Sequence, residues 1–308
     1  MGRYAVRRIL QAIPVFIGTT FLIYVMVWAL PGDPFAGRCG QRPCPQGYID
    51  RMTERFHMDE NIFVQYFYYM SSLVRGDFGE TFNGASVNTL LGQAFPVTVK
   101  LALVAIVIEA FIGIIAGIVT GLRKNSFIDN LVLVSTLFLI AIPTFVTGAL
   151  LQWILGVELG IMRPTVSASA PIHELIVPGF VLGSISMAFV TRLTRVSLVE
   201  NRRADYVRTA VAKGFTNARV TGVHLLRNSL IPVITWIGID LGGLMAGAIV
   251  TEGIFNIRGI GLMLFTAINR RDSALVVSVV SLLVLVYLIA NLIVDLMYAV
   301  LDPRIRYE

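Results

Sequence analysis

The chain has 308 residues, of which 56% are hydrophobic and only 14% are charged, and its mean hydropathy is +0.76. Soluble domains carry about 25% charged residues, so this composition excludes an ordinary water-soluble enzyme. A formal net charge of +6 would suit a nucleic-acid partner, but the placement of the basic residues indicates membrane topology instead.

Apolar residues gather in six blocks, most of them close to the ~20 residues with which an α-helix crosses a bilayer. Helices are favoured because lipid offers the backbone no hydrogen-bond partner and the alternation of a β-barrel is absent. The sequence therefore predicts an all-α integral membrane protein with about six transmembrane helices, at residues 9–30, 97–121, 128–157, 176–190, 232–250 and 275–301.

The placement of lysine and arginine predicts cytoplasmic N- and C-termini. In that orientation the inner segments hold 15 of the 25 basic residues and five acidic residues, as the positive-inside rule requires. The predicted organisation is a cytoplasmic N-terminus with the first span (1–30), an external segment (31–96), a five-helix core (97–302) containing a cytoplasmic loop at 192–231, and a cytoplasmic tail (303–308).

The external segment contains both cysteines of the chain, Cys39 and Cys44. An oxidising exterior would permit a disulfide between them, and two free thiols are the alternative. A zinc site is not favoured, because no further Cys or His accompanies this spacing. Residues 59–74 predict an amphipathic helix rich in aromatic side chains, which more often pack on neighbouring helices or lie at the membrane interface than bind a ligand.

The cytoplasmic loop at 192–231 is too regular to be a linker. Apolar side chains recur at helical spacing on both sides of Gly214, and Thr216 with Asn217 could cap a second helix. An ordered helix–turn–helix needs a surface to pack against, and this chain predicts no soluble domain. We therefore expect another polypeptide to contact the loop, with lipid headgroups as the alternative partner.

The sequence predicts neither catalytic residues nor a metal site. The three histidines, His57, His173 and His224, are scattered, and neither a zinc-protease motif nor a nucleophile elbow occurs. There is also no Gly-x4-Gly-Lys-Ser/Thr motif, so the chain lacks a P-loop for ATP. Any ATP used in its function would be hydrolysed by another subunit.

The loop carries a specific resemblance. Residues 205–214 (DYVRTAVAKG) and 224–232 (HLLRNSLIP) resemble the EAA loop of ABC importer permeases, in particular the B-type membrane subunit of the dipeptide/oligopeptide (and nickel) group. Further segments extend the resemblance, in order, over nearly the whole chain: 7–10, 13–14, 30–34, 76–79, 182–183, 192–195, 247–252 and 302–306.

The resemblance implies the type I ABC importer architecture, located in the bacterial inner (plasma) membrane. Two homologous permeases would form a heterodimer, an external solute-binding protein would deliver cargo, and two ATPase subunits, separate or fused, would bind ATP and magnesium. This chain itself would bind no cofactor. The EAA loop would be the coupling element that docks on the ATPase, with Ala210 and Ala212 small enough for close contact. Its coupling residues would be Asp205, Arg208, Ala210, Ala212, Lys213 and Gly214.

The fifth predicted span supplies candidates for the translocation pathway: Asp240, Gly243, Gly247 and Glu252. Small residues permit close helix approach, and an acid inside a span must face protein or water. Members of the resembled family usually carry an uncharged polar residue at the position of Asp240. This acid would therefore either tune the charge of the cargo or pair with a basic residue of the partner permease.

Three further charged residues are singled out. Residues 257–259 (IRG) stand where the resembled family usually has Trp-Pro-Gly. Arg258 would contact the docked binding protein or the carboxylate of the cargo, and a solvated loop arginine is the alternative. Glu109 and Asp295 lie inside predicted spans, and we expect both to form structural pairs.

The predicted function is that of a permease subunit of an ATP-driven importer for di- or oligopeptides, with nickel complexes or another small solute as the alternative cargo. Its predicted partners include membrane lipid and no nucleic acid. An ion-coupled secondary transporter would need its own coupling site near the membrane midplane, and the EAA-like loop argues against it. A membrane-embedded enzyme would need a catalytic set that the sequence lacks.

Overall fold

The computed structural model describes residues 2–28, 35, 39 and 44–301. Within those ranges the regular secondary structure is helical, apart from one isolated bridge between Glu80 and Ser86. This confirms the all-α fold class. The predicted family segments at 30–34 and 302–306 lie outside the described residues.

Five helices of the described chain are long and apolar enough to cross a membrane, and there are six if one bent pair counts as a single span. The five are α1 (Gly2–Trp28), α4 (Val87–Leu122), α7 (Ile172–Asn201), α11 (Ile231–Phe255) and α13 (Ser273–Leu301). The prediction of about six transmembrane helices is confirmed.

The third predicted span, 128–157, is not one straight helix. It consists of α5 (Phe127–Ala141), followed by α6 (Thr144–Leu151) and the π-helix η1 (Gln152–Glu158), with a bend of 100° between the two parts. Pro143 cannot donate a backbone hydrogen bond and disfavours the helical conformation of the residue before it. Ile142 is accordingly extended, with φ −87° and ψ 122°. The expectation of a continuous span here is wrong.

The chain divides into two compact units, residues 1–96 with 258–292 and residues 97–257 with 293–308. The first unit includes α2 (Gln46–Phe56), α3 (Ile62–Val74) and α12 (Ile260–Asn269). Its core is aromatic: Tyr66 of α3 stacks edge-on against Phe21 of α1, and its hydroxyl lies 2.8 Å from that of Thr20. Tyr69 donates a 2.8 Å hydrogen bond to Ser281 of α13.

The aromatic helix of the external segment therefore packs on neighbouring helices, although Phe67 is exposed. It starts later than the predicted residue 59, because Asn61 accepts a hydrogen bond from the Phe63 amide and caps the helix at Ile62. The structure joins Cys39 and Cys44 by a disulfide in the same segment.

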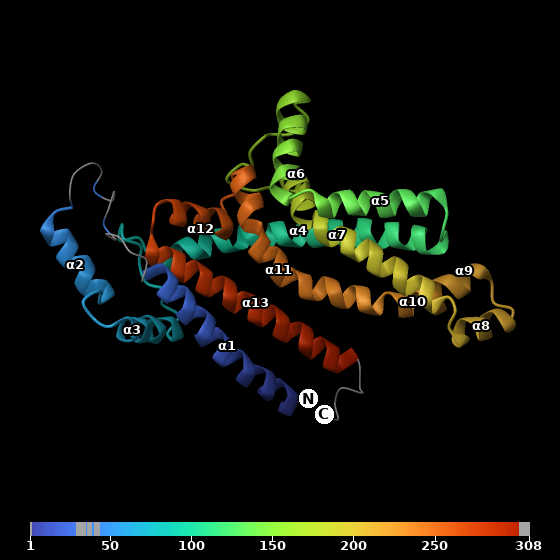
Figure 1. Ribbon diagram of the computed structural model, residues 1–308, viewed down its shortest axis with the longest axis horizontal. Coiled ribbons are helices and arrows are strands. Elements are labelled where there is room, and N and C mark those ends of the chain that lie inside the picture. Colours follow the sequence, from blue (N-terminus) through green and yellow to red (C-terminus); the bar gives the residue numbers. More distant parts are fainter. Residues whose placement is uncertain (1, 29–34, 36–38, 40–43, 302–308) are drawn as a thin grey trace. The chain divides into compact units, whose positions relative to one another are not determined.

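The second unit is built around α7, which packs against α5, α6, α10 and α11 (Figure 1). It also packs closely on α4, where Gly113, Gly117 and Gly121 repeat every four residues. A Cβ added at Gly113 would lie 2.7 Å from the Val190 side chain, and one added at Gly117 would overlap Thr194. This small-residue stripe lets two helix backbones approach as in membrane helix pairs generally.

Helix α7 is also longer than predicted. The sequence placed a span at 176–190 and a loop from residue 192, whereas the helix continues to Asn201. The first ten residues of the predicted loop are therefore helical. After α7 come α8 (Asp205–Ala212), α9 (Asn217–Arg219), the π-helix η2 (Val220–Leu225) and α10 (Leu226–Ser229).

Candidate functional site

Helices α8 to α10 form a hairpin, defined here as residues 205–229, beyond the C-terminal end of α7 (Figure 1). The hairpin has an apolar core of its own, continuous with the last turns of α7. The buried residues of this core are Leu198, Val207, Ala210, Val220 and Leu225, with Phe215 and Leu226 packed against them. This burial makes the hairpin a folded element rather than a flexible loop.

The turn of the hairpin depends on Gly214, which has φ +75°. L-amino acids pay a conformational cost in this left-handed region, and glycine does not. Just after the turn, the Phe215 ring stacks parallel to His224, with ring centroids 5.6 Å apart. The Arg219 guanidinium lies 4.6 Å from the centre of the same ring. Gly214 therefore permits the turn after α8, and the stack joins the residue that follows the turn to α9 and η2.

The outer face of α8 carries most of the residues assigned to coupling. The side chains of Asp205 and Arg208 are 96% and 73% exposed, and only 3.6 Å separates their charged atoms. Ala212, Lys213 and Gly214 are also exposed. Ala210 differs: it is 4% exposed and belongs to the core of the hairpin. The expectation that Ala210 offers a docking surface is corrected, because its methyl group packs inward.

Sequence reasoning missed Val211 as a surface residue of this face. Its side chain is 58% exposed, although it is apolar and neighbours a well-packed core. Tyr206 is 39% exposed and its hydroxyl donates a 2.6 Å hydrogen bond to Asn201. The face of α8 thus combines charged side chains with an exposed aliphatic residue, as protein–protein contact surfaces do.

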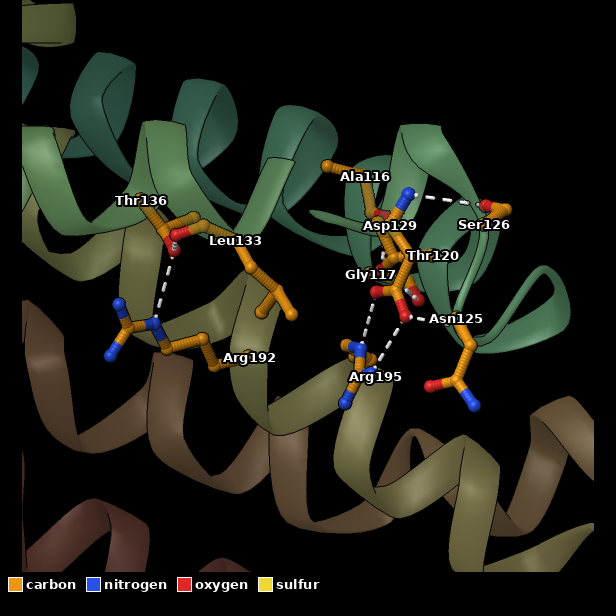
Figure 2. Close-up of polar contacts among 10 residues, drawn as sticks. All are labelled: Ala116, Gly117, Thr120, Asn125, Ser126, Asp129, Leu133, Thr136, Arg192 and Arg195. Carbon is orange, nitrogen blue, oxygen red and sulfur yellow. Dashed lines mark hydrogen bonds and ion pairs between the residues drawn. The ribbon is translucent and has the colours of Figure 1, made fainter. Parts of the chain in front are cut away.

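An ion pair joins the C-terminal part of α7 to the start of α5 (Figure 2). Arg195 Nε donates to Asp129 Oδ1 at 2.6 Å, and its Nη2 donates to Oδ2 at 2.7 Å. The Asp129 side chain is 1% exposed and that of Arg195 is 17% exposed. Such a bidentate pair fixes both distance and orientation. In the sequence analysis these two residues are only part of the charge count of the predicted inner segments. They are 66 positions apart, and nothing in the sequence predicts their contact.

Two further contacts support the same junction. Figure 2 shows Arg192, one turn before Arg195, reaching Thr136 of α5, with Nε 3.1 Å from the hydroxyl oxygen. At the end of α7, Arg202 Nη1 lies 3.4 Å from the backbone oxygen of Leu122 in α4. The segment that carries the hairpin is therefore attached by polar contacts to two neighbouring helices.

The pathway candidates separate into two groups. Asp240, Gly243 and Gly247 share one face of α11; the two glycines are exposed and Asp240 is partly exposed. Glu252 is fully buried and accepts a 2.6 Å hydrogen bond from Thr98 of α4. Glu252 therefore lies within the packed interior of the described unit and not on the exposed face that the two glycines share, and its assignment to the pathway stays a prediction.

The remaining charged candidates are placed as follows. Arg258 is exposed, directly after the buried Ile257. Asp295 is partly buried in α13. Glu109 is fully buried in α4, and it interacts with the carboxyl group of Asp240. The charged neighbour of Glu109 is therefore a second acid, and the structural pairing expected for Glu109 stays a prediction.

Comparison with known proteins agrees with this architecture. The model of a family described as "binding-protein-dependent transport system inner membrane component" matches residues 113–307, and the model of its N-terminal membrane component matches residues 1–111. A dipeptide transport system permease protein of Alkalihalophilus pseudofirmus is 35% identical to this chain, with both chains covered completely.

Two further relatives are 34% identical, again over the full length of both chains. They are an oligopeptide transport system permease protein of Haemophilus influenzae and a glutathione transport system permease protein of Escherichia coli K12. The helical membrane fold, the family models and these full-length relatives agree. The chain belongs to the family of binding-protein-dependent transport system inner membrane components and is a multi-pass permease subunit.

Proposed function

We propose that this permease carries di- or oligopeptides into the bacterial cytoplasm as part of an ATP-driven importer. The cargo follows from the relatives, whose names specify dipeptides, oligopeptides and glutathione. The mechanism follows from one observation: the hairpin 205–229 has its own apolar core and turns a charged, partly apolar face outward.

In this proposal the outer face of α8 docks on an ATPase subunit in the cytoplasm. ATP and magnesium are bound there, and closure of the ATPase pair moves the hairpin. Since the hairpin core includes Leu198 of α7, the movement passes to α7, and through the Asp129–Arg195 ion pair to α5. The second permease completes the pathway, and an external binding protein supplies the cargo. Both termini are cytoplasmic in this arrangement.

Cargo is tested by uptake in cells that lack other peptide importers and express this permease with its partner subunits. The panel contains a labelled dipeptide, a labelled tetrapeptide, glutathione and a nickel complex. We expect uptake of at least one peptide that stops when ATP is depleted. Uptake of nickel alone, or peptide uptake that continues without ATP on an ion gradient, would contradict the proposal.

The hairpin is tested by Gly214→Val. The left-handed backbone costs an L-residue roughly 1–2 kcal/mol, and a β-branched side chain is stiffer still. We expect the helices to remain inserted, while the ATPase subunits co-purify poorly or hydrolyse ATP without transport. Gly160→Val is the matched control, because Gly160 also has positive φ (+61°) and open space around it, outside the hairpin. Normal coupling in Gly214→Val would refute the docking role.

A further inference from the structure

The carboxyl group of Asp240 lies beside an open strip of α11, defined here as the exposed Gly243 and Gly247. Asp240 is the tenth of the 25 residues of that helix. A Cβ added at Gly243 would stand 3.5 Å from Asp240 Oδ1, in ordinary contact, and would meet no other neighbour within 4 Å. Gly247, one turn further along the same face, is also exposed. The strip therefore leaves room for another molecule next to the Asp240 carboxyl.

A second carboxyl, that of Glu109, interacts with the first. Glu109 is 0% exposed, and among the described residues its oxygens and the buried Asp240 Oδ2 have no hydrogen-bond partner apart from each other's carboxyl group. The charged group acting on Glu109 among the described residues is Asp240, another acid. An uncompensated buried carboxyl is costly, and an ionisable residue inside a span marks a functional site by default.

We propose that Asp240, together with the interacting carboxyl of Glu109, binds the ammonium group of a peptide cargo during translocation. This inference rests on the proposed import of peptides. An ammonium group brings three hydrogen-bond donors and one positive charge, which complement oxygens that lack donors. The adjacent glycines accommodate the peptide backbone that follows the amino terminus.

A metal ion suits this site less well. Zinc takes four protein or water ligands and calcium six to eight. Among the described residues there is no cluster of three or more His, Cys, Asp or Glu side chains. The pair of carboxyls matches the smaller requirement of an ammonium group.

The experiment measures the local charge preference directly. Gly243→Cys places a thiol beside Asp240 in the complete transporter. Its labelling rate is compared for an aminoethyl methanethiosulfonate, which carries a primary ammonium, and for a neutral methanethiosulfonate of similar size. We expect the cationic reagent to be favoured about tenfold relative to Gly253→Cys on the same helix. Adding Asp240→Asn should abolish this preference, because it removes the negative charge and with it one charge-assisted hydrogen bond to the ammonium group.

A second arm uses peptides. A tripeptide with a free amino terminus should slow labelling of Gly243→Cys more than its N-acetyl form does, and Glu109→Gln should reduce that difference. Equal labelling by both reagents, or a preference that survives Asp240→Asn, would overturn the ammonium site. So would loss of the second permease from the Asp240→Asn complex, because the acid would then pair with a basic residue of that subunit. Failure of the proposed function would be recognised by a different result, because the wild-type transporter would then import no peptide.

Discussion

Breaking the Asp129–Arg195 pair should destabilise the junction between α5 and α7. Asp129→Ala leaves a guanidinium whose side chain is only 17% exposed without its two short hydrogen bonds. Removing one partner of a buried ion pair typically costs 3–5 kcal/mol. Since Arg195 retains some contact with solvent, we expect about 3 kcal/mol of lost unfolding free energy, and a similar loss for Arg195→Met, which leaves the carboxylate buried.

The double variant distinguishes the pair from the two side chains taken singly. Replacing both Asp129 by Leu and Arg195 by Met removes the buried charges together and retains apolar volume, and such replacements of a buried pair are often neutral or stabilising. We expect the double variant to recover more than half of the stability that either single variant loses. The measurement is thermal unfolding of the detergent-purified complex, together with ATP hydrolysed per peptide transported.

The control for this cycle is the exposed pair of Asp205 and Arg208. Its side chains are 96% and 73% in solvent, where an ion pair has little effect on stability. Asp205→Ala should therefore leave the unfolding temperature unchanged. If the effects of Asp129→Leu and Arg195→Met, each measured singly, add within about 0.5 kcal/mol in the double variant, the two residues are not coupled. The transmission role would then be refuted.

Two further predictions concern packing and docking. Gly117→Ala should lower the unfolding temperature of the complex markedly, because the new methyl group would overlap Thr194 and overpacking costs about 1–3 kcal/mol; Gly92→Ala, with open space in the same helix, should not. Val211→Asp should weaken co-purification of the ATPase about tenfold by removing an exposed apolar contact, whereas Thr209→Asp, at another exposed position of α8, should have a much smaller effect. An equal fall in unfolding temperature for Gly117→Ala and Gly92→Ala would contradict the packing prediction. An equal loss of ATPase co-purification for Val211→Asp and Thr209→Asp would contradict the docking prediction.

Much of this fold is predictable because a bilayer restricts the options. Long apolar stretches locate the spans, and the length of each stretch is set by the thickness of the hydrocarbon core. The prediction fails at 142–143, where hydropathy stays high and a single proline bends the chain by 100°. Hydropathy indicates whether a segment suits lipid or water, but it does not indicate where the helix axis bends.

The short helices were missed for a different reason. Helix α2 begins after Pro45, and its apolar side chains recur at helical spacing at Tyr48, Ile49, Met52 and Phe56. The prediction for the external segment did not use this period, because it assigned a helix there only from residue 59. Helix α12 is apolar but has only ten residues, too few to span a membrane and easily read as part of a loop. Local chemistry did predict the turn at Gly214, because a glycine that follows a helical period and precedes a cap residue has a clear conformational meaning.

The candidate site was predictable in its position and less so in its contacts. The motif at 205–214 located the hairpin, but the sequence does not say which alanine of the helix faces inward. Ala210 and Ala212 are two positions apart and lie on different faces, and only packing against Leu198 distinguishes them. Long-range pairs such as Asp129 with Arg195 leave no signal in one sequence, because each residue alone is an ordinary charge next to a predicted span.

The Asp129 side chain has a second role that must be separated from the ion pair. Ser126 caps α5 by accepting a 3.2 Å hydrogen bond from the Asp129 amide, and Asp129 Oδ2 accepts a 2.8 Å hydrogen bond from the Asn125 amide. The carboxylate also lies in the first turn, where the helix dipole favours negative charge. A loss of coupling in Asp129→Ala could therefore come from a frayed helix start.

Ser126→Ala separates these two effects. It removes the cap, at a cost of about 1 kcal/mol, and leaves both hydrogen bonds between Arg195 and Asp129 available. We expect a small fall in unfolding temperature and an unchanged ratio of ATP hydrolysed to peptide transported. Asp129→Asn, which keeps the side-chain size and loses the charge, should instead raise that ratio. If Ser126→Ala uncouples transport as strongly as Asp129→Asn, then the integrity of the helix start, and not the ion pair, carries the movement from α7 to α5.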